Sequence, residues 1–120
     1  YAETLAGRRY YLDKWNKADR WSTESSAINF PIQGSGGDMK NLAISVLHDK
    51  YKGDMNFAWD LHDGIFYWVP RAKKSIDLIK DVRETLNNLP YKDSWGWEPR
   101  IPMPWDASVG LNWGQMRELE

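Results

Sequence analysis

The chain has 120 residues, of which 42% are hydrophobic, which suits one globular domain over residues 1–120 with a modest core. Its 16 basic and 17 acidic residues give a net charge of −1, which excludes a basic field over the whole domain, so any contact with DNA depends on a local patch. The absence of cysteine excludes disulfides, thiolate metal sites and cysteine nucleophiles.

The N-terminal third predicts a short hairpin followed by a helix. Gly7 suits the turn of a hairpin within the first dozen residues, and a helical pattern runs from Asp19 to about Phe30. Pro31 lacks an amide donor, so we expect it to end or kink this helix.

A second helix is predicted by an apolar stripe with helical spacing. The stripe consists of Met39, Leu42, Ala43, Val46 and Leu47. We expect this helix to end near Tyr51, before Gly53.

The middle of the chain predicts a β-hairpin. Met55, Phe57, Trp59 and Leu61 alternate with polar or small residues, which is the period of a half-buried strand. The Asp63-Gly64 pair then precedes a second aromatic and β-branched run, residues 65–69, and is expected to form the central residues of a type I′ turn.

The C-terminal part predicts an amphipathic helix between Pro70 and Pro90, an ordered loop over residues 91–106 and a strand over residues 107–113. The fold class expected from this order is α+β, with an antiparallel sheet, centred on the hairpin, that helices cover on one side. Most of the eight tryptophans are expected to fill core volume. No apolar stretch could cross a membrane and the first residues lack a signal-peptide pattern, so we expect a soluble, cytoplasmic protein without membrane contact.

The clearest chemical candidate is Asp63 at the predicted hairpin tip. A carboxylate on a rigid hairpin is well placed for Mg²⁺, which prefers a few carboxylates together with substrate phosphates. The alternative is that Asp63 is only the residue type that Asp-Gly turns favour. His62 can contact a phosphate or cap the strand, and Arg8 and Arg9 can bind phosphate or form a solvated strand end.

Four blocks in register resemble family A DNA polymerases, of the DNA polymerase I type. They are Tyr1–Arg9, Asn29–Ser35 with Asp38, His62-Asp63, and Val109–Leu111. The resemblance covers essentially the whole chain, which is similar to the last quarter of the polymerase region. It implies a partial palm domain, with motifs at residues 29–38 and 62–63.

This resemblance implies roles for the matching residues. Asp63 would be one of two palm aspartates that hold two catalytic Mg²⁺ ions, and His62 would contact the primer-terminal phosphate. Asn29 and Gln33 would face the minor groove at the primer terminus, where purine N3 and pyrimidine O2 are acceptors in every correct base pair. Arg8 and Arg9 fall in a block that resembles the family's backbone-contacting region.

Two departures from the family's pattern would leave the site with one carboxylate fewer and remove a cationic contact to DNA. Gly64 stands where the family's His-Asp-Glu motif has Glu, and Ser25 stands where members commonly have Arg, four residues before the asparagine. The second aspartate, the nucleotide-binding helix and the thumb have no counterpart in these 120 residues, so we expect no polymerase activity from the chain alone.

The partners implied are primer–template DNA, bound weakly, the missing N-terminal part of the polymerase, and a second copy in a homo-oligomer. The main alternative is a non-catalytic nucleic-acid-binding module that stacks bases on exposed sheet aromatics, which the polymerase interpretation would bury. A tryptophan-rich carbohydrate-binding module and a His-Asp phosphohydrolase fit the four blocks less well.

Overall fold

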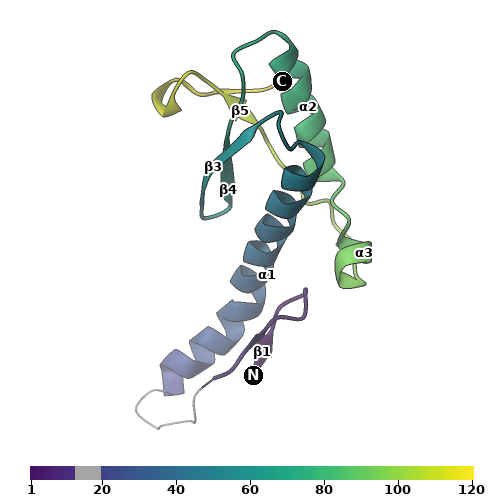
Figure 1. Ribbon diagram of the computed structural model, residues 1–120. Coiled ribbons are helices and arrows are strands. Elements are labelled where there is room, and N and C mark those ends of the chain that lie inside the picture. The colour runs from purple at the N-terminus through teal and green to yellow at the C-terminus, as the bar shows by residue number, and fades with distance from the viewer. Residues whose placement is uncertain (13–19) are drawn as a thin grey trace.

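The computed structural model describes residues 1–12 and 20–120 and has α+β architecture, which confirms the fold class (Figure 1). Its elements in chain order are β1 (Ala2–Glu3), β2 (Arg9–Tyr10), α1 (Arg20–Lys50), β3 (Asn56–Leu61), β4 (Gly64–Trp68), α2 (Lys74–Asn87), α3 (Tyr91–Trp95), β5 (Ser108–Val109), the 3-10 turn η1 (Trp113–Gln115) and β6 (Arg117–Glu118). The strands form three separate two-stranded antiparallel sheets, β1–β2, β3–β4 and β5–β6, where a single sheet was expected.

The long helix α1 sets the shape of the molecule, which measures 60 × 34 × 25 Å. The β1–β2 hairpin lies along its N-terminal half, and the other elements gather around its C-terminal half (Figure 1). None of the described helices is both long enough and apolar enough to cross a membrane.

Pro31 lies inside α1, so the prediction of two separate helices is wrong. A proline in a helix interior has no amide donor, so the carbonyl four residues earlier, that of Ala27, lacks its helical hydrogen bond. The Ser35 hydroxyl, one turn later, donates to the Pro31 carbonyl and accepts a 2.9 Å hydrogen bond from the Leu5 amide. Before the proline, the Tyr10 ring stacks on Phe30 with centroids 4.9 Å apart, so the N-terminal hairpin contacts the helix on both sides of Pro31.

The β1–β2 hairpin confirms the first prediction. Gly7 has φ = +86°, a conformation that favours glycine, and Ala2 pairs with Tyr10. The hairpin packs closely on α1 at Gly34, where an added Cβ would lie 2.7 Å from the methyl carbon of the buried Thr4.

The β3–β4 hairpin is also confirmed. The prediction that its first strand alternates strictly between apolar and polar faces is wrong, because β3 contains a β-bulge. Phe57 pairs with Tyr67 and Trp59 with Phe66, so Ala58 is an extra residue in β3. Phe57 therefore faces α1 with Tyr67, whereas Trp59 faces outward.

The hairpin turn is shifted by one residue from the prediction. Leu61 pairs with Gly64, so the two central residues are His62 and Asp63 rather than Asp63 and Gly64. His62 alone among the described non-glycine residues has a positive φ, +52°, whereas a type I′ turn needs positive φ at both central positions.

The core is small and lies where α1, α2 and α3 meet. Its buried members are Ala43, Leu47, Tyr51, Met55, Leu86, Leu89 and Tyr91. The seven tryptophans that the structure describes are half-buried or exposed, so the expectation that most fill the core is wrong; Trp15 lies outside the described residues. The predicted helix after Pro70 is confirmed as α2.

The C-terminal predictions are only partly confirmed. Tyr91–Trp95, at the start of the predicted loop, form helix α3. The predicted strand over residues 107–113 shrinks to Ser108–Val109, because Trp113–Gln115 form a 3-10 turn. That turn brings β6 back to pair with β5.

Candidate functional site

The first candidate group is the His62-Asp63 turn at the tip of the β3–β4 hairpin. Both side chains are exposed, and Asp63 makes no hydrogen bond or ion pair with any described residue. The hairpin thus presents a free carboxylate to solvent from a two-residue turn, as the sequence predicted.

A lysine of α1 holds this turn, which sequence reasoning missed. The Lys40 ammonium lies 2.5 Å from Oδ2 of Asp60 and 3.0 Å from the His62 carbonyl oxygen. The alternating pattern predicted from the sequence places Asp60 on the same strand face as His62, away from the apolar face. No local signal in the sequence marks the bulge that turns Asp60 toward the helix.

The second candidate group is a shallow groove beside the N-terminal half of α1. Asn29 and Gln33 are exposed, one helical turn apart, and both line it. Its other lining residues are Tyr10, Trp21, Ser22, Ser25, Ser26 and Phe30. None of the described residues that line the groove is charged. Hydroxyls and amides can donate to phosphate and sugar oxygens or to base edges, and aromatic rings can stack on bases.

The structure places both predicted phosphate-binding arginines in contacts within the chain. Arg8 forms a 2.8 Å ion pair with Asp38, and its guanidinium lies 5.2 Å from the centre of the Phe30 ring. Arg9 forms a 2.9 Å ion pair with Glu3. Hydrogen bonding to Glu3 raises the pKa of Arg9. Each arginine must share or exchange a carboxylate partner before it can bind a phosphate.

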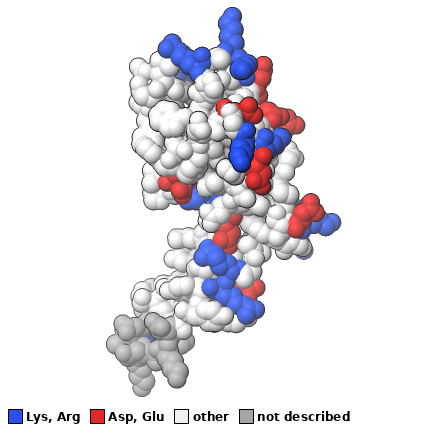
Figure 2. Space-filling model, in the orientation of Figure 1, with Lys and Arg blue, Asp and Glu red and all other residues white. Residues whose placement is uncertain are grey.

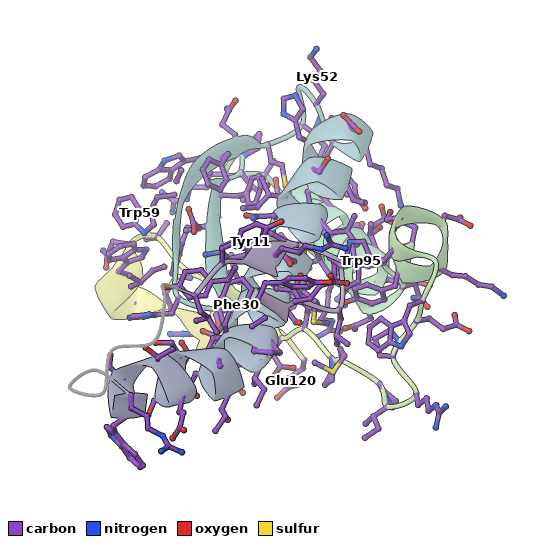
Figure 3. The ribbon with its side chains drawn as sticks, turned by 90° about the horizontal axis from the view of Figure 1, so that it is seen from below. Tyr11, Phe30, Lys52, Trp59, Trp95 and Glu120 are labelled. Atoms are coloured by element: carbon purple, nitrogen blue, oxygen red, sulfur yellow. The ribbon has the colours of Figure 1, made fainter. Side chains whose placement is uncertain are left out.

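The charge distribution offers no large basic surface on the face shown in Figure 2. Blue and red side chains lie beside one another, and a broad uncharged area covers the β3–β4 hairpin and the C-terminal segment. Part of this area is the outer face of the hairpin, where Trp59 lies beside η1 (Figure 3). The Trp59 and Trp113 rings meet edge-on with centroids 4.1 Å apart, and Phe66 joins them.

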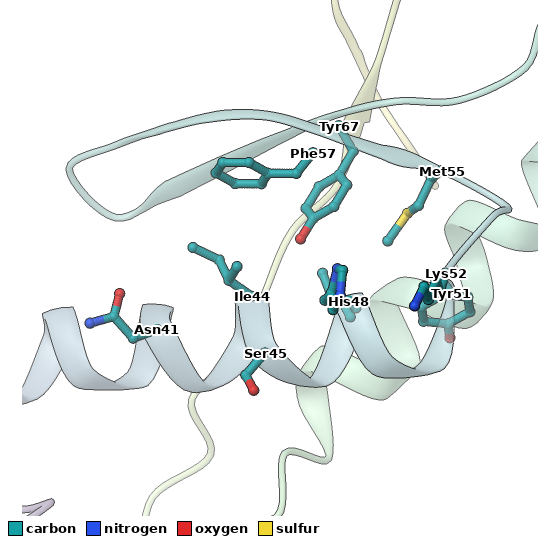
Figure 4. A pocket seen from close by; sticks show the side chains of 10 residues that line it. Asn41, Ile44, Ser45, His48, Tyr51, Lys52, Met55, Phe57 and Tyr67 are labelled. Atoms are coloured by element: carbon teal, nitrogen blue, oxygen red, sulfur yellow. The ribbon is translucent and has the colours of Figure 1, made fainter.

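The inner face of the hairpin forms an apolar pocket with the C-terminal half of α1 (Figure 4). Phe57 and Met55 line one side, and Ile44 and His48 the other. The Tyr67 hydroxyl is buried there without a hydrogen-bond partner in the described residues, and burial raises its pKa. None of the predicted site residues lies in this pocket.

The described residues fit one ligand of a magnesium site but not a whole site. Among them, no three His, Cys, Asp or Glu side chains lie close enough to hold a metal ion together. Asp63 is an exposed carboxylate of the kind that Mg²⁺ prefers, and Asp60 is paired with Lys40. A complete site would need further carboxylates from outside the described residues.

Comparison with known proteins finds similarity to short stretches of DNA polymerases. The thermostable DNA polymerase I of Thermus thermophilus is 28% identical over 124 aligned residues, which cover 98% of this chain and 14% of the relative. DNA polymerase I of Deinococcus radiodurans is 29% identical, covering 94% of this chain and 11% of its own length. DNA polymerase theta of Drosophila melanogaster is 27% identical, covering 99% and 6%.

The chain therefore spans at most 14% of the length of these three relatives. No solved structure matches it significantly. The sequence profile described as "DNA polymerase family A" matches residues 1–115, which include every predicted site residue. On this match, the chain belongs to DNA polymerase family A.

Proposed function

We propose that this chain acts as part of a DNA-directed DNA polymerase, carrying one metal-binding aspartate and part of the cradle for the primer terminus. The observation that carries the proposal is the family match over residues 1–115 together with the exposed, unpaired Asp63 at a two-residue hairpin tip. Template-directed DNA synthesis in replication or repair is the activity to which these groups would contribute.

Each group has a role that its surroundings support. Asp63 would hold Mg²⁺ together with a carboxylate from another part of the polymerase, and the bound ion would supply positive charge to stabilise the anionic transition state. His62, beside it, would donate to the primer-terminal phosphate. Asn29 and Gln33, exposed side by side in the groove, would donate amide hydrogens to minor-groove acceptors.

The chain alone should not polymerise DNA, since it supplies one carboxylate of a two-metal site. Gly64 also adds no carboxylate where the family's motif has one. Primer extension with a labelled primer–template and Mg²⁺ is expected to give no product. Extension that disappears in Asp63→Asn would contradict the proposal that the site is incomplete.

A nuclear magnetic resonance titration tests the primer-terminus role directly. Adding primer–template duplex should shift the side-chain amide signals of Asn29 and Gln33 but not that of Asn88, an exposed control that donates to the Glu84 carbonyl. Binding is expected to be weak and to weaken with salt, because few cations are available to phosphates. Shifts confined to the control, or absent at both groove amides, would count against the proposal.

Exposed aromatic side chains favour a second candidate function, a non-catalytic surface that stacks single-stranded bases. Trp59, Trp68 and Trp113 are all exposed, with Trp68 exposed by 65%. Base–aromatic stacking contributes about 1–3 kcal/mol per base. Two results together would support this function over the first. Oligo(dT) should quench the tryptophan fluorescence, with less quenching in Trp68→Ala, and primer–template duplex should leave the amide signals of Asn29 and Gln33 unchanged.

The same outer face supports the proposed protein partners. We propose that it contacts the rest of the polymerase, or a second copy when the chain is alone, because exposed apolar surface and unpaired strand edges promote association. Sedimentation equilibrium over a range of concentrations should show self-association that Trp59→Ser weakens. A monomer at high concentration would contradict the homo-oligomer.

A further inference from the structure

Lys40 joins two parts of the chain that the proposed function needs together. It belongs to α1, the helix that carries Asn29 and Gln33, and its ammonium contacts Asp60 and the His62 carbonyl of the hairpin. Its side chain is 15% exposed, whereas a free surface lysine extends into solvent. These two contacts link segments 20 and 22 residues apart in the chain.

The bulge at Ala58 makes this contact possible. Two β3 residues oppose one β4 residue there, so every β3 side chain before the bulge lies on the face opposite to the one that strict alternation assigns. Phe57 and Asp60 consequently both face α1. A strand without the extra residue would place them on opposite faces.

The Lys40 contact also bears on the backbone of the turn. His62 adopts φ = +52°, which is uncommon for residues other than glycine and persists when the surroundings hold it in place. Lys40 donates to the carbonyl oxygen of this same residue, one position before Asp63. A change in the backbone at His62 would redirect the Asp63 side chain.

We infer that Lys40 is a positioning residue, which anchors the His62-Asp63 turn to α1 and so fixes where the Asp63 carboxylate lies relative to the groove amides. Gln33 is seven residues before Lys40, a separation of about 10 Å along the helix axis. One rigid helix would thereby set the spacing between the primer-terminus groove and the metal-binding carboxylate. This inference rests on the proposed function.

The test compares four variants of the full 120-residue chain by nuclear magnetic resonance. Lys40→Met removes the anchor, and Lys80→Met is the matched control, an exposed helical lysine without a described partner. Asp60→Asn removes the charge of the exposed partner and is the milder second variant. Asp63→Asn removes the carboxylate that is to be positioned.

Two readouts report on position without requiring polymerase activity. The first is the strong amide–Hα contact within His62 that a positive φ produces. The second is broadening of amide signals by Mn²⁺, added alone as the probe. In the wild type, broadening that Asp63→Asn abolishes should reach both the hairpin tip and the α1 amides around Lys40.

In Lys40→Met we expect the positive-φ signature of His62 to be lost and the broadening of α1 to disappear, while the hairpin tip stays broadened. Asp60→Asn should change both readouts in the same direction. If Lys40→Met does not fold, the spectra of Asp60→Asn alone test whether the contact with Lys40 positions the turn. Unchanged spectra in the folded variants would overturn the inference. Tip broadening that Asp63→Asn fails to remove would instead overturn the metal-binding role, while the His62 signature would still test Lys40.

Discussion

Three glycines in α1 test whether the N-terminal hairpin packs on this helix as the structure shows. Replacing a glycine with alanine inside a helix stabilises it by about 1 kcal/mol, because glycine loses more backbone freedom on folding. At Gly36 and Gly37 an added Cβ would meet nothing within 4 Å. Both Gly36→Ala and Gly37→Ala should therefore raise the free energy of unfolding by about 1 kcal/mol each.

Gly34→Ala should behave differently. Its Cβ would lie 2.7 Å from Cγ2 of Thr4 and 3.3 Å from Cε2 of Phe30. Thr4 has little room to move, since it is buried and its hydroxyl accepts a 3.1 Å hydrogen bond from the Arg8 amide. Overpacking of this kind costs about 1–3 kcal/mol, which equals or exceeds the gain in helix propensity.

Urea denaturation followed by circular dichroism measures the outcome. We expect Gly34→Ala to be neutral or destabilising by up to about 2 kcal/mol, which is about 1–3 kcal/mol below the other two variants. The three substitutions are chemically identical and lie within one turn of the same helix, so they control for one another. If Gly34→Ala stabilised the chain as much as Gly36→Ala, the close contact between α1 and the hairpin would be refuted.

Three further predictions concern the core and the ion pairs. Leu47→Ala should lower the free energy of unfolding by about 2–5 kcal/mol and Leu61→Ala by less than about 0.5 kcal/mol in urea denaturation, because their exposed fractions are 1% and 54%. Arg8→Met should lower the free energy of unfolding by about 1–3 kcal/mol, because it removes the ion-pair partner of Asp38, whose side chain is only 10% exposed. Arg9→Met should cost less, because both members of its pair with Glu3 are exposed to solvent, and equal losses in thermal melts would contradict this. A hydrogen bond from a tyrosine hydroxyl is the main cause that lowers the pKa of Asp81. Its stabilisation should be complete above the ordinary aspartate pKa of about 4 and lost as the pH falls through the lower folded value, so Asp81→Asn should flatten the acid side of a stability–pH profile.

The sequence predicted those turns and helix boundaries that depend on residues close together in the chain. Gly7 marked the first turn, and Pro70 and Pro90 enclosed α2. The exposed position of Asp63 also followed from its place between two aromatic runs. Each of these depends on neighbours in the chain, so one sequence is enough to infer them.

Contacts between distant segments decided the features that the sequence did not predict. The helix continues through Pro31 where the N-terminal hairpin packs on it, with Tyr10 at Phe30 and the Leu5 amide at Ser35. The groove brings Gln33 beside Asn29 only because α1 continues through Pro31. Local propensity competes with such tertiary contacts and, at these positions, is overridden by them.

The bulge at Ala58 accounts for two properties that the sequence did not predict, the contact of Asp60 with Lys40 and the outward position of Trp59. Because Phe57 and Trp59 fall on opposite faces, the inner face gains a carboxylate that Lys40 can bind, and the outer face gains an indole that packs edge-on against Trp113. A regular strand with Phe57, Trp59 and Leu61 on one side would bury all three against α1 and point Asp60 into solvent, where it could not anchor the turn. The anchoring of the His62-Asp63 turn and the exposed aromatic face therefore have the same structural cause, although the polymerase proposal uses the first and the base-stacking alternative uses the second.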